Sequence, residues 1–174
     1  MDTFLEYMIK QRRSKKTILK CILLAYLTMI VTLFLTMVIL MFPMFLSIWP
    51  LMIFFLLIAC YKLISRFDVE YEYTLTNGEL DVDKIVHKKK RYRVVSVHSK
   101  TFTHFGKVSD KEYKNLDFSS FLKVINANAN SPMMEDYYAV FYDNGQKTLL
   151  IFNPTGKMIE SFKFFNKRVV NKDF

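Results

Sequence analysis

Two regions of the chain differ in how hydrophobic and polar residues alternate. Between Lys20 and Lys62 lie 41 consecutive residues without Asp, Glu, Lys or Arg. A single helix of that length would measure about 60 Å, whereas the hydrocarbon core of a bilayer is about 30 Å thick. Pro43 lies near the middle of the stretch and disfavours helix for the residue before it. The pattern therefore predicts two transmembrane helices, at about residues 17–41 and 45–64, folded into a hairpin.

A soluble core helix and a signal peptide both fit this apolar stretch poorly. Helices buried in the core of a soluble protein seldom run so far without a charged residue. A secretory signal peptide has a shorter apolar region, and a small-x-small cleavage site follows it, which this sequence lacks. We therefore expect an integral membrane protein whose direct partner is the lipid bilayer.

The distribution of charge predicts the orientation of the hairpin. Six basic residues lie before or at the start of the first predicted span, Lys62 and Arg66 lie at or after the end of the second, and the short connection carries no charge. The positive-inside rule then places both termini in the cytoplasm. Residues 1–66 carry a net charge of +6 of the total of +9, so topology and contact with the lipid surface explain most of the basicity.

Residues 1–16 read as a basic amphipathic segment. Thr3 and Glu6 have the spacing of a capping box, and the apolar residues that follow would share one helix face. We expect a short helix on the membrane surface. In the simpler alternative, the positive charges of this segment serve only to orient the hairpin. Cys21 and Cys60 would lie near the cytoplasmic face, where a reducing environment predicts free thiols.

From residue 67 onward the pattern changes to strict alternation, which is typical of half-buried strands. Residues 69–76 and 79–86 alternate, and Asn77-Gly78 between them predicts a tight hairpin turn. Further strands are predicted at residues 92–98, 101–105, 121–127, 137–142 and 147–152. Asp143-Asn144-Gly145 predicts a turn between the last two.

One helix follows the predicted strands. Asn153 suits the N-cap and Pro154 the first helical position. An apolar stripe follows on one face, made by Met158, Ile159, Phe162 and Phe165. The expected fold class is α+β: the transmembrane hairpin (residues 17–66), then a seven-stranded antiparallel pleckstrin-homology-like barrel with a C-terminal helix (residues 67–174). Another antiparallel α+β sheet or a helix-grip fold also fits this pattern.

Two segments carry a resemblance to a known family. Residues 71–85 (YEYTLTNGELDVDKI) and 147–154 (KTLLIFNP), together with the two predicted spans, resemble an uncharacterised family of small bacterial membrane proteins. The resemblance covers nearly the whole chain and implies a cytoplasmic pleckstrin-homology-like domain after two transmembrane helices. Its motifs are structural and imply no chemistry. The stretch from Asn126 to Asn130 departs from any pattern, and we expect a loop there.

A basic cluster in the predicted turn after residue 86 is the main candidate for ligand contact. The candidate residues are Lys88, Lys89, Lys90, Arg91 and Arg93. Each basic group near an anionic membrane surface contributes about 1 kcal/mol. The resemblance points the same way, since pleckstrin-homology-like domains often use basic hairpin loops for anionic ligands. The alternative is a solvated hairpin tip that discourages edge pairing.

The other polar residues have no spacing that is typical of a metal, cofactor or catalytic site. Glu79, Asp81 and Asp83 share a strand face but lack the pattern of a calcium loop, and the three histidines lack zinc spacing with any cysteine. Motifs for nucleophilic serine, phosphate-binding loops, metalloproteases and dinucleotides are missing, as is an RNA-recognition signature. We therefore expect a protein that is not an enzyme and binds no nucleic acid. A further hypothesis, besides the two binding functions given below, is a lipid-active enzyme whose catalytic residues come from separate parts of the sequence.

Within the first predicted span, Thr28, Thr32 and Thr36 form a weakly polar stripe at helical spacing. Such a stripe is typical of helix packing, either within the hairpin or between protomers. The sequence is therefore compatible with a homo-oligomer. The leading hypothesis is a bacterial inner-membrane protein whose cytoplasmic domain binds a partner protein or anionic lipid headgroups. The alternative is an accessory subunit that associates with a membrane transporter or enzyme through the hairpin.

Overall fold

The computed structural model describes residues 3–170 and divides the chain into two compact units. One unit is the helical hairpin, Arg13–Asp68. The other, called here the sheet domain, joins the residues up to Arg12 with those from Val69 onward. The hairpin is therefore an insertion within the sheet domain, where the sequence predicts a segment that precedes it. Residues 1–2 and 171–174, which form the two ends of the predicted domains, lie outside the described residues.

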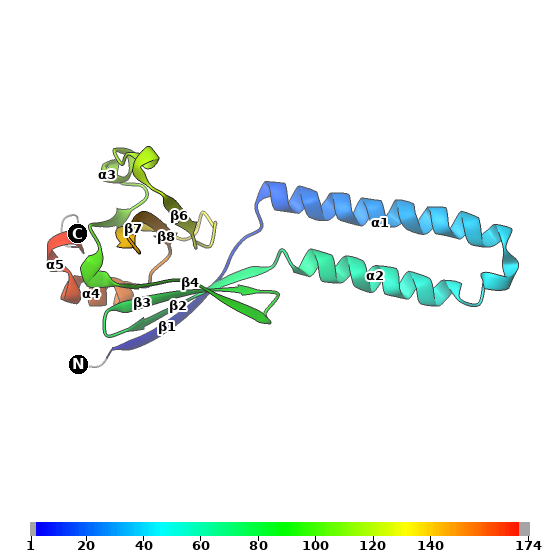
Figure 1. The fold of residues 1–174 in the computed structure, drawn as a ribbon, viewed down its shortest axis with the longest axis horizontal. Coiled ribbons are helices and arrows are strands. Elements are labelled where there is room, and N and C mark those ends of the chain that lie inside the picture. Colours follow the sequence, from blue (N-terminus) through cyan, green and yellow to red (C-terminus); the bar gives the residue numbers. More distant parts are fainter. Residues whose placement is uncertain (1–2, 171–174) are drawn as a thin grey trace. The chain divides into compact units, whose positions relative to one another are not determined.

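The hairpin consists of two helices and a short connection. Helix α1 (Lys15–Met41) begins at Ser14, whose hydroxyl accepts a hydrogen bond from the Thr17 N–H at 3.2 Å. The 3₁₀ helix η1 (Pro43–Phe45) follows, and α2 (Trp49–Ser65) completes the unit (Figure 1). The first helix thus ends just before Pro43, where the sequence predicts the break.

Only α1 is long and apolar enough to cross a membrane among the residues that the structure describes. In its most apolar stretch of 18 residues, only 6% of the residues are buried within the protein, unlike the core helix of a soluble domain. Helix α2 has 17 residues and begins later than predicted, because the residues after Pro43 form a turn. The structure therefore contains one membrane-span candidate and one shorter apolar helix, where the sequence predicts two spans.

The sheet domain contains two four-stranded sheets (Figure 1). The first has the order β1 (Phe4–Lys10), β2 (Val69–Thr76), β3 (Glu79–Val86) and β4 (Lys90–His98), with every pair antiparallel. The second has the order β5 (His104–Lys107), β7 (Tyr137–Asp143), β8 (Gln146–Phe152) and β6 (Lys123–Asn126). The predicted turns are present, and Asn77 and Asn144 adopt φ values of 49° and 50°.

The predicted N-terminal surface helix is wrong, because β1 is a strand. It pairs with β2 from Phe4 opposite Thr76 to Lys10 opposite Glu70. The odd-numbered residues of this strand face the core, and Ile9 is 3% exposed. The same seven residues have apolar groups at both helical and alternating spacing, and pairing with β2 decides between the two.

The prediction of seven strands in an entirely antiparallel barrel is also wrong. The described residues form eight strands, and β6 pairs with β8 in parallel, with Lys123 opposite Thr148. Residues 108–122 carry the chain from β5 to β6 through α3 (Lys111–Lys114) and the 3₁₀ helix η3 (Phe118–Ser120). This long connection brings β6 to the far edge of the second sheet, beside β8.

The C-terminal helix begins later than predicted. Helix α4 (Gly156–Phe165) is capped by Thr155, whose hydroxyl accepts from the Met158 N–H at 3.4 Å. A second short helix, α5 (Lys167–Val170), follows it. Asn153, the predicted cap, is instead 4% exposed and accepts from the Ala129 N–H at 2.6 Å. Its amide nitrogen donates to the Glu135 carbonyl oxygen at 2.7 Å and to the Asp136 carboxylate at 2.8 Å.

An aromatic core fills the space between the sheets and α4. Met158 and Phe162 of the predicted apolar stripe are fully buried, and the Phe162 ring lies 5.6 Å from Phe102 and 5.7 Å from Phe105. The predicted loop at residues 126–130 is part of this core. Its Ala127 is buried, and the Ala127 carbonyl accepts the hydroxyl of Tyr73. Burial raises the pKa of Tyr73 above its ordinary value.

Candidate functional site

The end of the first sheet that is covalently joined to the hairpin carries the basic turn. The chain leaves the sheet after β1 and returns at Val69, the first residue of β2. Val69 lies opposite Val86, the last residue of β3, so the β3–β4 turn projects from this same end (Figure 1). We call it the hairpin-proximal end. One row of outward-facing residues crosses all four strands there: Lys10, Glu70, Ile85 and Arg91.

The β3–β4 turn has an unusual backbone for its residues. The Lys89 N–H donates to the Val86 carbonyl at 3.2 Å, and His87 and Lys88 have φ values of 55° and 53°. A two-residue turn with both φ values positive normally contains Asn-Gly. Left-handed conformations cost non-glycine residues about 1 kcal/mol or more each. The sheet therefore holds His87 and Lys88 at two positions that glycine would occupy with less strain.

The structure separates the predicted basic cluster into three groups. Lys88, Lys89 and Arg91 line one cavity of about 490 Å³, together with Met8, Glu70 and Ile85. Lys90 lies opposite Val86, and strand alternation places it on the other face from Arg91. Arg93 stands in the next row and is engaged by two carboxylates.

Acidic residues on the outer face bind both arginines. Arg91 Nη2 lies 2.6 Å from Glu72 Oε2, and its Nη1 lies 3.8 Å from Asp83 Oδ2. Arg93 Nε lies 2.5 Å from Asp83 Oδ1, and its Nη1 lies 2.8 Å from Asp81 Oδ1. Although strand alternation places both on the outer face, Glu72 and Asp83 are only 3% and 7% exposed. The two arginines are therefore partly neutralised, unlike the lysines of the turn.

The environment of Glu72 raises the pKa of its carboxyl group above the ordinary glutamate value. Burial of the carboxyl group is the largest cause and raises its pKa, and a hydrogen bond with Glu6 raises it further. The positive charge of Arg91 opposes both effects. Glu72 thus joins β1, β2 and β4 through one side chain, and sequence alternation alone could not reveal that its outward-facing carboxylate is buried.

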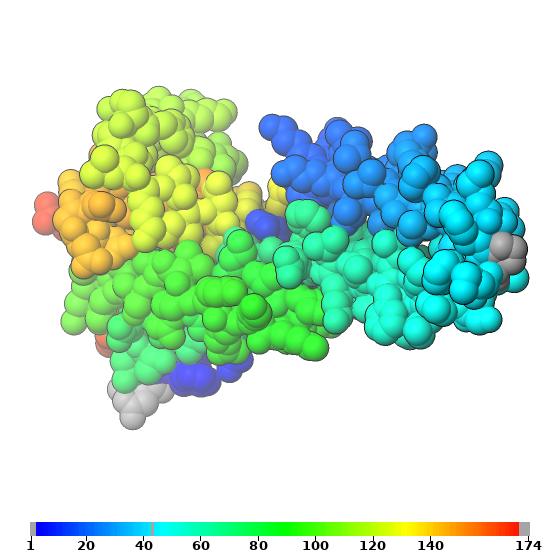
Figure 2. Space-filling model, turned by 45° about the vertical axis from the view of Figure 1, so that its right-hand side comes forward, coloured from blue at the N-terminus to red at the C-terminus, as the bar shows by residue number. Residues whose placement is uncertain are grey.

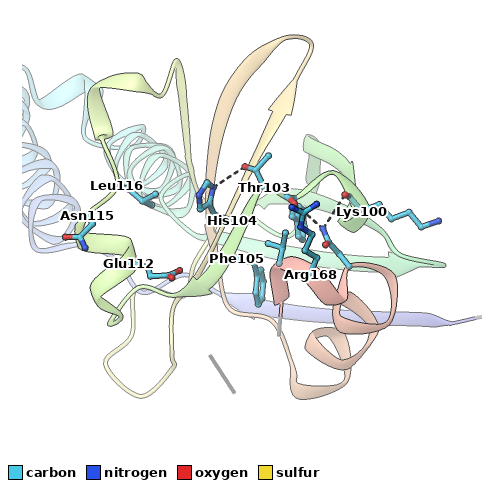
Figure 3. Close-up of a pocket in the computed structure, with 11 residues that line it drawn as sticks. Lys100, Thr103, His104, Phe105, Glu112, Asn115, Leu116 and Arg168 are labelled. Atoms are coloured by element: carbon cyan, nitrogen blue, oxygen red, sulfur yellow. Dashed lines mark hydrogen bonds between the residues drawn. The ribbon is translucent and has the colours of Figure 1, made fainter. Parts of the chain in front are cut away.

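A second and larger cavity lies beside the second sheet (Figure 3). It has a volume of about 710 Å³ and is bounded by η2 (Ser99–Thr101), β5, α3 and α5. Lys100, His104 and Arg168 contribute positive or titratable groups, and Glu112 contributes the acid. His104 Nδ1 lies 3.3 Å from the Thr103 hydroxyl. Sequence reasoning missed this cavity because four separate segments of the chain form it.

The candidate metal ligands considered from the sequence have other partners. His98 Nδ1 accepts from the Lys100 N–H at 3.2 Å, and its ring packs against Phe165 with centroids 5.6 Å apart. Glu79 accepts from the Ser96 hydroxyl at 3.1 Å. Within residues 3–170, no group of three or more His, Cys, Asp or Glu side chains could hold a metal ion.

The threonine stripe of α1 lies on the face that packs against α2. Thr28 Oγ1 is 3.6 Å from Cys60 Sγ, and it also donates to the Ala25 carbonyl at 2.7 Å. Thr32 and Thr36 each donate to the carbonyl four residues earlier, also at 2.7 Å. Figure 2 shows the side chains of α1 and α2 in contact along the hairpin. Thr28 therefore takes part in the contact between the two helices of the hairpin.

An ion pair closes the base of the hairpin. Arg13 Nη2 lies 2.8 Å from Asp68 Oδ1, and Arg13 Nη1 is 4.0 Å from Cys21 Sγ. Cys21 and Cys60 are both free and buried. The sequence suggests only an orienting charge at Arg13, and a partner 55 positions away could not be assigned without the fold.

A family model described as a bacterial PH-like domain (DUF6106) matches residues 1–172. The chain belongs to this family. The match spans the sheet domain and the inserted hairpin alike, so it agrees with the bacterial PH-like family expected from the sequence. It also agrees with a mixed α+β fold that ends in a C-terminal helix, and it suggests a binding module. No curated protein and no solved structure shows a significant match.

Proposed function

We propose that this protein is a non-enzymatic binding module of the bacterial inner membrane, with both termini in the cytoplasm. The hairpin spans the bilayer, and the hairpin-proximal end of the first sheet binds anionic lipid headgroups through the β3–β4 turn. One observation carries the proposal. The basic turn projects from the same sheet end at which the chain enters and leaves the hairpin.

Covalent geometry limits how far the turn can lie from the membrane. Three residues separate Ser65, the end of α2, from Val69, so they span at most about 14 Å. Val86 is the direct partner of Val69, at a strand spacing of about 5 Å. The beginning of the turn therefore stays within about 20 Å of the end of α2 in any orientation of the domain. A tether of this length gives a high effective concentration at the headgroup layer.

The charges available in the turn suit a lipid surface. The ammonium groups of Lys88, Lys89 and Lys90 have no acidic partner among the described residues. At about 1 kcal/mol for each basic group near an anionic surface, they would contribute about 3 kcal/mol. Arg91 and Arg93 would add less, because buried carboxylates already offset their charge.

The dimensions of the hairpin are compatible with two spans. Helix α1 meets the length and composition of a span, and the 17 residues of α2 measure about 26 Å. A bilayer accommodates a slightly short helix by local thinning, and the apolar residues between Pro43 and Trp49 can extend the apolar length. Basic residues flank the base of the hairpin and none lies in its connection, which supports cytoplasmic termini.

The test uses the full chain in nanodiscs of neutral lipid and of neutral lipid mixed with phosphatidylglycerol. Hydrogen exchange is measured for the amides of residues 86–92. We expect slower exchange in the anionic discs, lost at high salt and in a K88A/K89A/K90A variant. A K111A/K114A variant of α3 serves as the control and should behave as wild type. Equal exchange of the turn in both kinds of disc would contradict the proposal.

The main alternative is an accessory subunit that associates through its hairpin. The threonine stripe is the polar surface that α1 offers for such contact, and Thr28 already lies 3.6 Å from Cys60 of α2. An association through the outward faces of the hairpin would have to rely on apolar residues such as Phe34 and Phe55, which are 67% and 61% exposed. These faces suit lipid chains equally well.

A further inference from the structure

The cavity beside the β3–β4 turn combines positive charge with an apolar floor. Its charged groups are Lys88, Lys89 and Arg91, opposed by one acid, Glu70, which leaves a net charge of +2. Met8 and Ile85 form the apolar part, and Met8 is 51% exposed, whereas Ile85 is 8% exposed. The cavity is open to solvent, and its volume of about 490 Å³ accommodates a lipid headgroup.

Arg91 is held in position before any ligand arrives. One of its terminal nitrogens lies 2.6 Å from Glu72, and the other lies 3.8 Å from Asp83. Both carboxylates are buried, whereas the Arg91 side chain stays 58% exposed, so the two ion pairs restrict the guanidinium group and leave it open to solvent. A guanidinium has five N–H donors, and two carboxylate contacts leave donors for an anion. Because its fork is pre-oriented, Arg91 loses less conformational entropy on binding than a free side chain would.

The turn supplies the second half of the site. Lys88 and Lys89 project into the same cavity from a backbone in which Lys88 has a φ of 53°. Strain of this kind is retained where the surrounding structure imposes it, and it is often found in ligand-binding segments. Two ammonium groups and one guanidinium therefore line the same cavity, and all three are donors that phosphate oxygens accept.

We propose that this cavity binds a single phosphate group carried on an apolar molecule, and that the ligand is the phosphodiester of an anionic phospholipid. The inference rests on the proposed function and adds a defined site to it. The phosphate lies among Lys88, Lys89 and Arg91, and the glycerol and first carbons of the lipid lie on Met8 and Ile85. Binding at such a site is saturable and depends on the shape of Arg91, whereas contact with a charged surface depends only on charge.

The test measures calorimetric binding to the full chain in neutral nanodiscs at about 150 mM salt, where surface charges are screened beyond about 8 Å. The probes are short-chain phosphatidylglycerol and, in a separate arm, inorganic phosphate. We expect saturable binding of the lipid and at least tenfold weaker binding of inorganic phosphate, about 1.4 kcal/mol. A K88A/K89A variant should weaken lipid binding by about tenfold or more, and K111A/K114A should leave it within about twofold.

Two further variants separate a built site from diffuse charge. R91K keeps the positive charge but loses the fork, so it should weaken binding several-fold, with an unchanged melting midpoint as the check on folding. M8E places an acid on the exposed floor without removing a base, and it should abolish lipid binding. Arg91→Ala is avoided, because it would leave Glu72 buried without its partner.

Each outcome bears on one of the two claims. Unsaturable lipid binding, or an R91K variant equal to wild type, overturns the phosphate site even if exchange in the turn still responds to anionic discs. Equal affinity for inorganic phosphate overturns the lipid as the source of the phosphate. Loss of every response to anionic lipid overturns the proposed function together with the site.

Discussion

The hairpin and the sheet domain bury their apolar residues in opposite ways. In the sheet domain, Tyr73, Phe141 and Phe152 are fully buried by other side chains of the same unit. In the hairpin, large apolar residues such as Met37 and Phe34 are 72% and 67% exposed. The sheet domain therefore carries its own core, whereas the hairpin needs an apolar environment supplied from outside. The two units therefore differ in where their apolar side chains lie, and they meet in sequence at residues 12–13 and 68–69.

The insertion makes the two units interdependent through β1. This strand precedes the hairpin, and its partner β2 follows it. A fragment beginning at residue 67 would lack Ile9 and leave the edge of β2 unpaired. Studies of the binding surface therefore require the full chain.

The largest expected effect comes from the core of the sheet domain. Phe162→Ala should lower the free energy of unfolding by about 3–5 kcal/mol, because it empties a site surrounded by aromatic rings. Leu33→Ala, at a hairpin position that is 58% exposed, should change it by less than about 0.5 kcal/mol. Denaturant unfolding of the full chain in detergent, followed by the signal of the sheets, measures both. Similar effects for the two variants would contradict the comparison.

The second test addresses β1. Ile9→Ala should cost about 2–4 kcal/mol, since Ile9 is 3% exposed and faces the core. Met8→Ala, one position earlier on the other face, should cost less than about 1 kcal/mol. A surface helix would not distinguish the two residues so sharply. The same unfolding measurement decides, and near-equal costs would argue against the strand.

A smaller effect is expected at the buried amide of Asn153. Asn153→Ala removes the partners of the Ala129 N–H and of the Asp136 carboxylate, and one unsatisfied buried group costs about 1–3 kcal/mol. Asn115→Ala, at an exposed position, is the control and should be close to neutral. If the two variants were equally stable, the role of Asn153 in joining the loop at residues 126–130 to the core would be wrong.

The ion pair at the base of the hairpin should contribute least at equilibrium. Arg13 and Asp68 side chains are 32% and 36% exposed, so Arg13→Ala should cost at most about 1 kcal/mol, and less at high salt. The readout is the thermal midpoint of the hairpin in micelles at two salt concentrations. A large, salt-independent loss would show that the pair lies in a much less polar environment.

The pH dependence should report Glu72. Because its pKa is raised on folding, the folded chain binds this proton more tightly than the unfolded chain does. Stability should therefore fall as the pH rises from the ordinary glutamate range through the raised value. Glu72→Gln should flatten that part of the profile, because it removes the group whose pKa changes on folding. A profile unchanged by Glu72→Gln would contradict this assignment.

The sequence allowed some features to be predicted because their causes are local. Asn77-Gly78 and Asn144-Gly145 set their turns through backbone preference, and the alternation of β2 and β3 follows from one buried face. The pairing of β1 was not predictable, because 58 residues separate its end from the start of β2. The partners of Arg91 and Arg93 depend on the register of β2, β3 and β4, including its shift between Val82 and Asp83, so the division of the basic cluster could not be read from charge alone.

The most direct test compares two turns of the same domain. In a chain with Cys21 and Cys60 changed to Ser, Lys89→Cys in the β3–β4 turn and Asn144→Cys in the β7–β8 turn each carry an environment-sensitive fluorophore. Both are measured in neutral and in anionic nanodiscs. We expect a blue shift in anionic discs at position 89, abolished by high salt, and no shift at position 144. A shift at position 144 alone, or at neither position, would contradict the claim that the hairpin-proximal end meets the lipid headgroups.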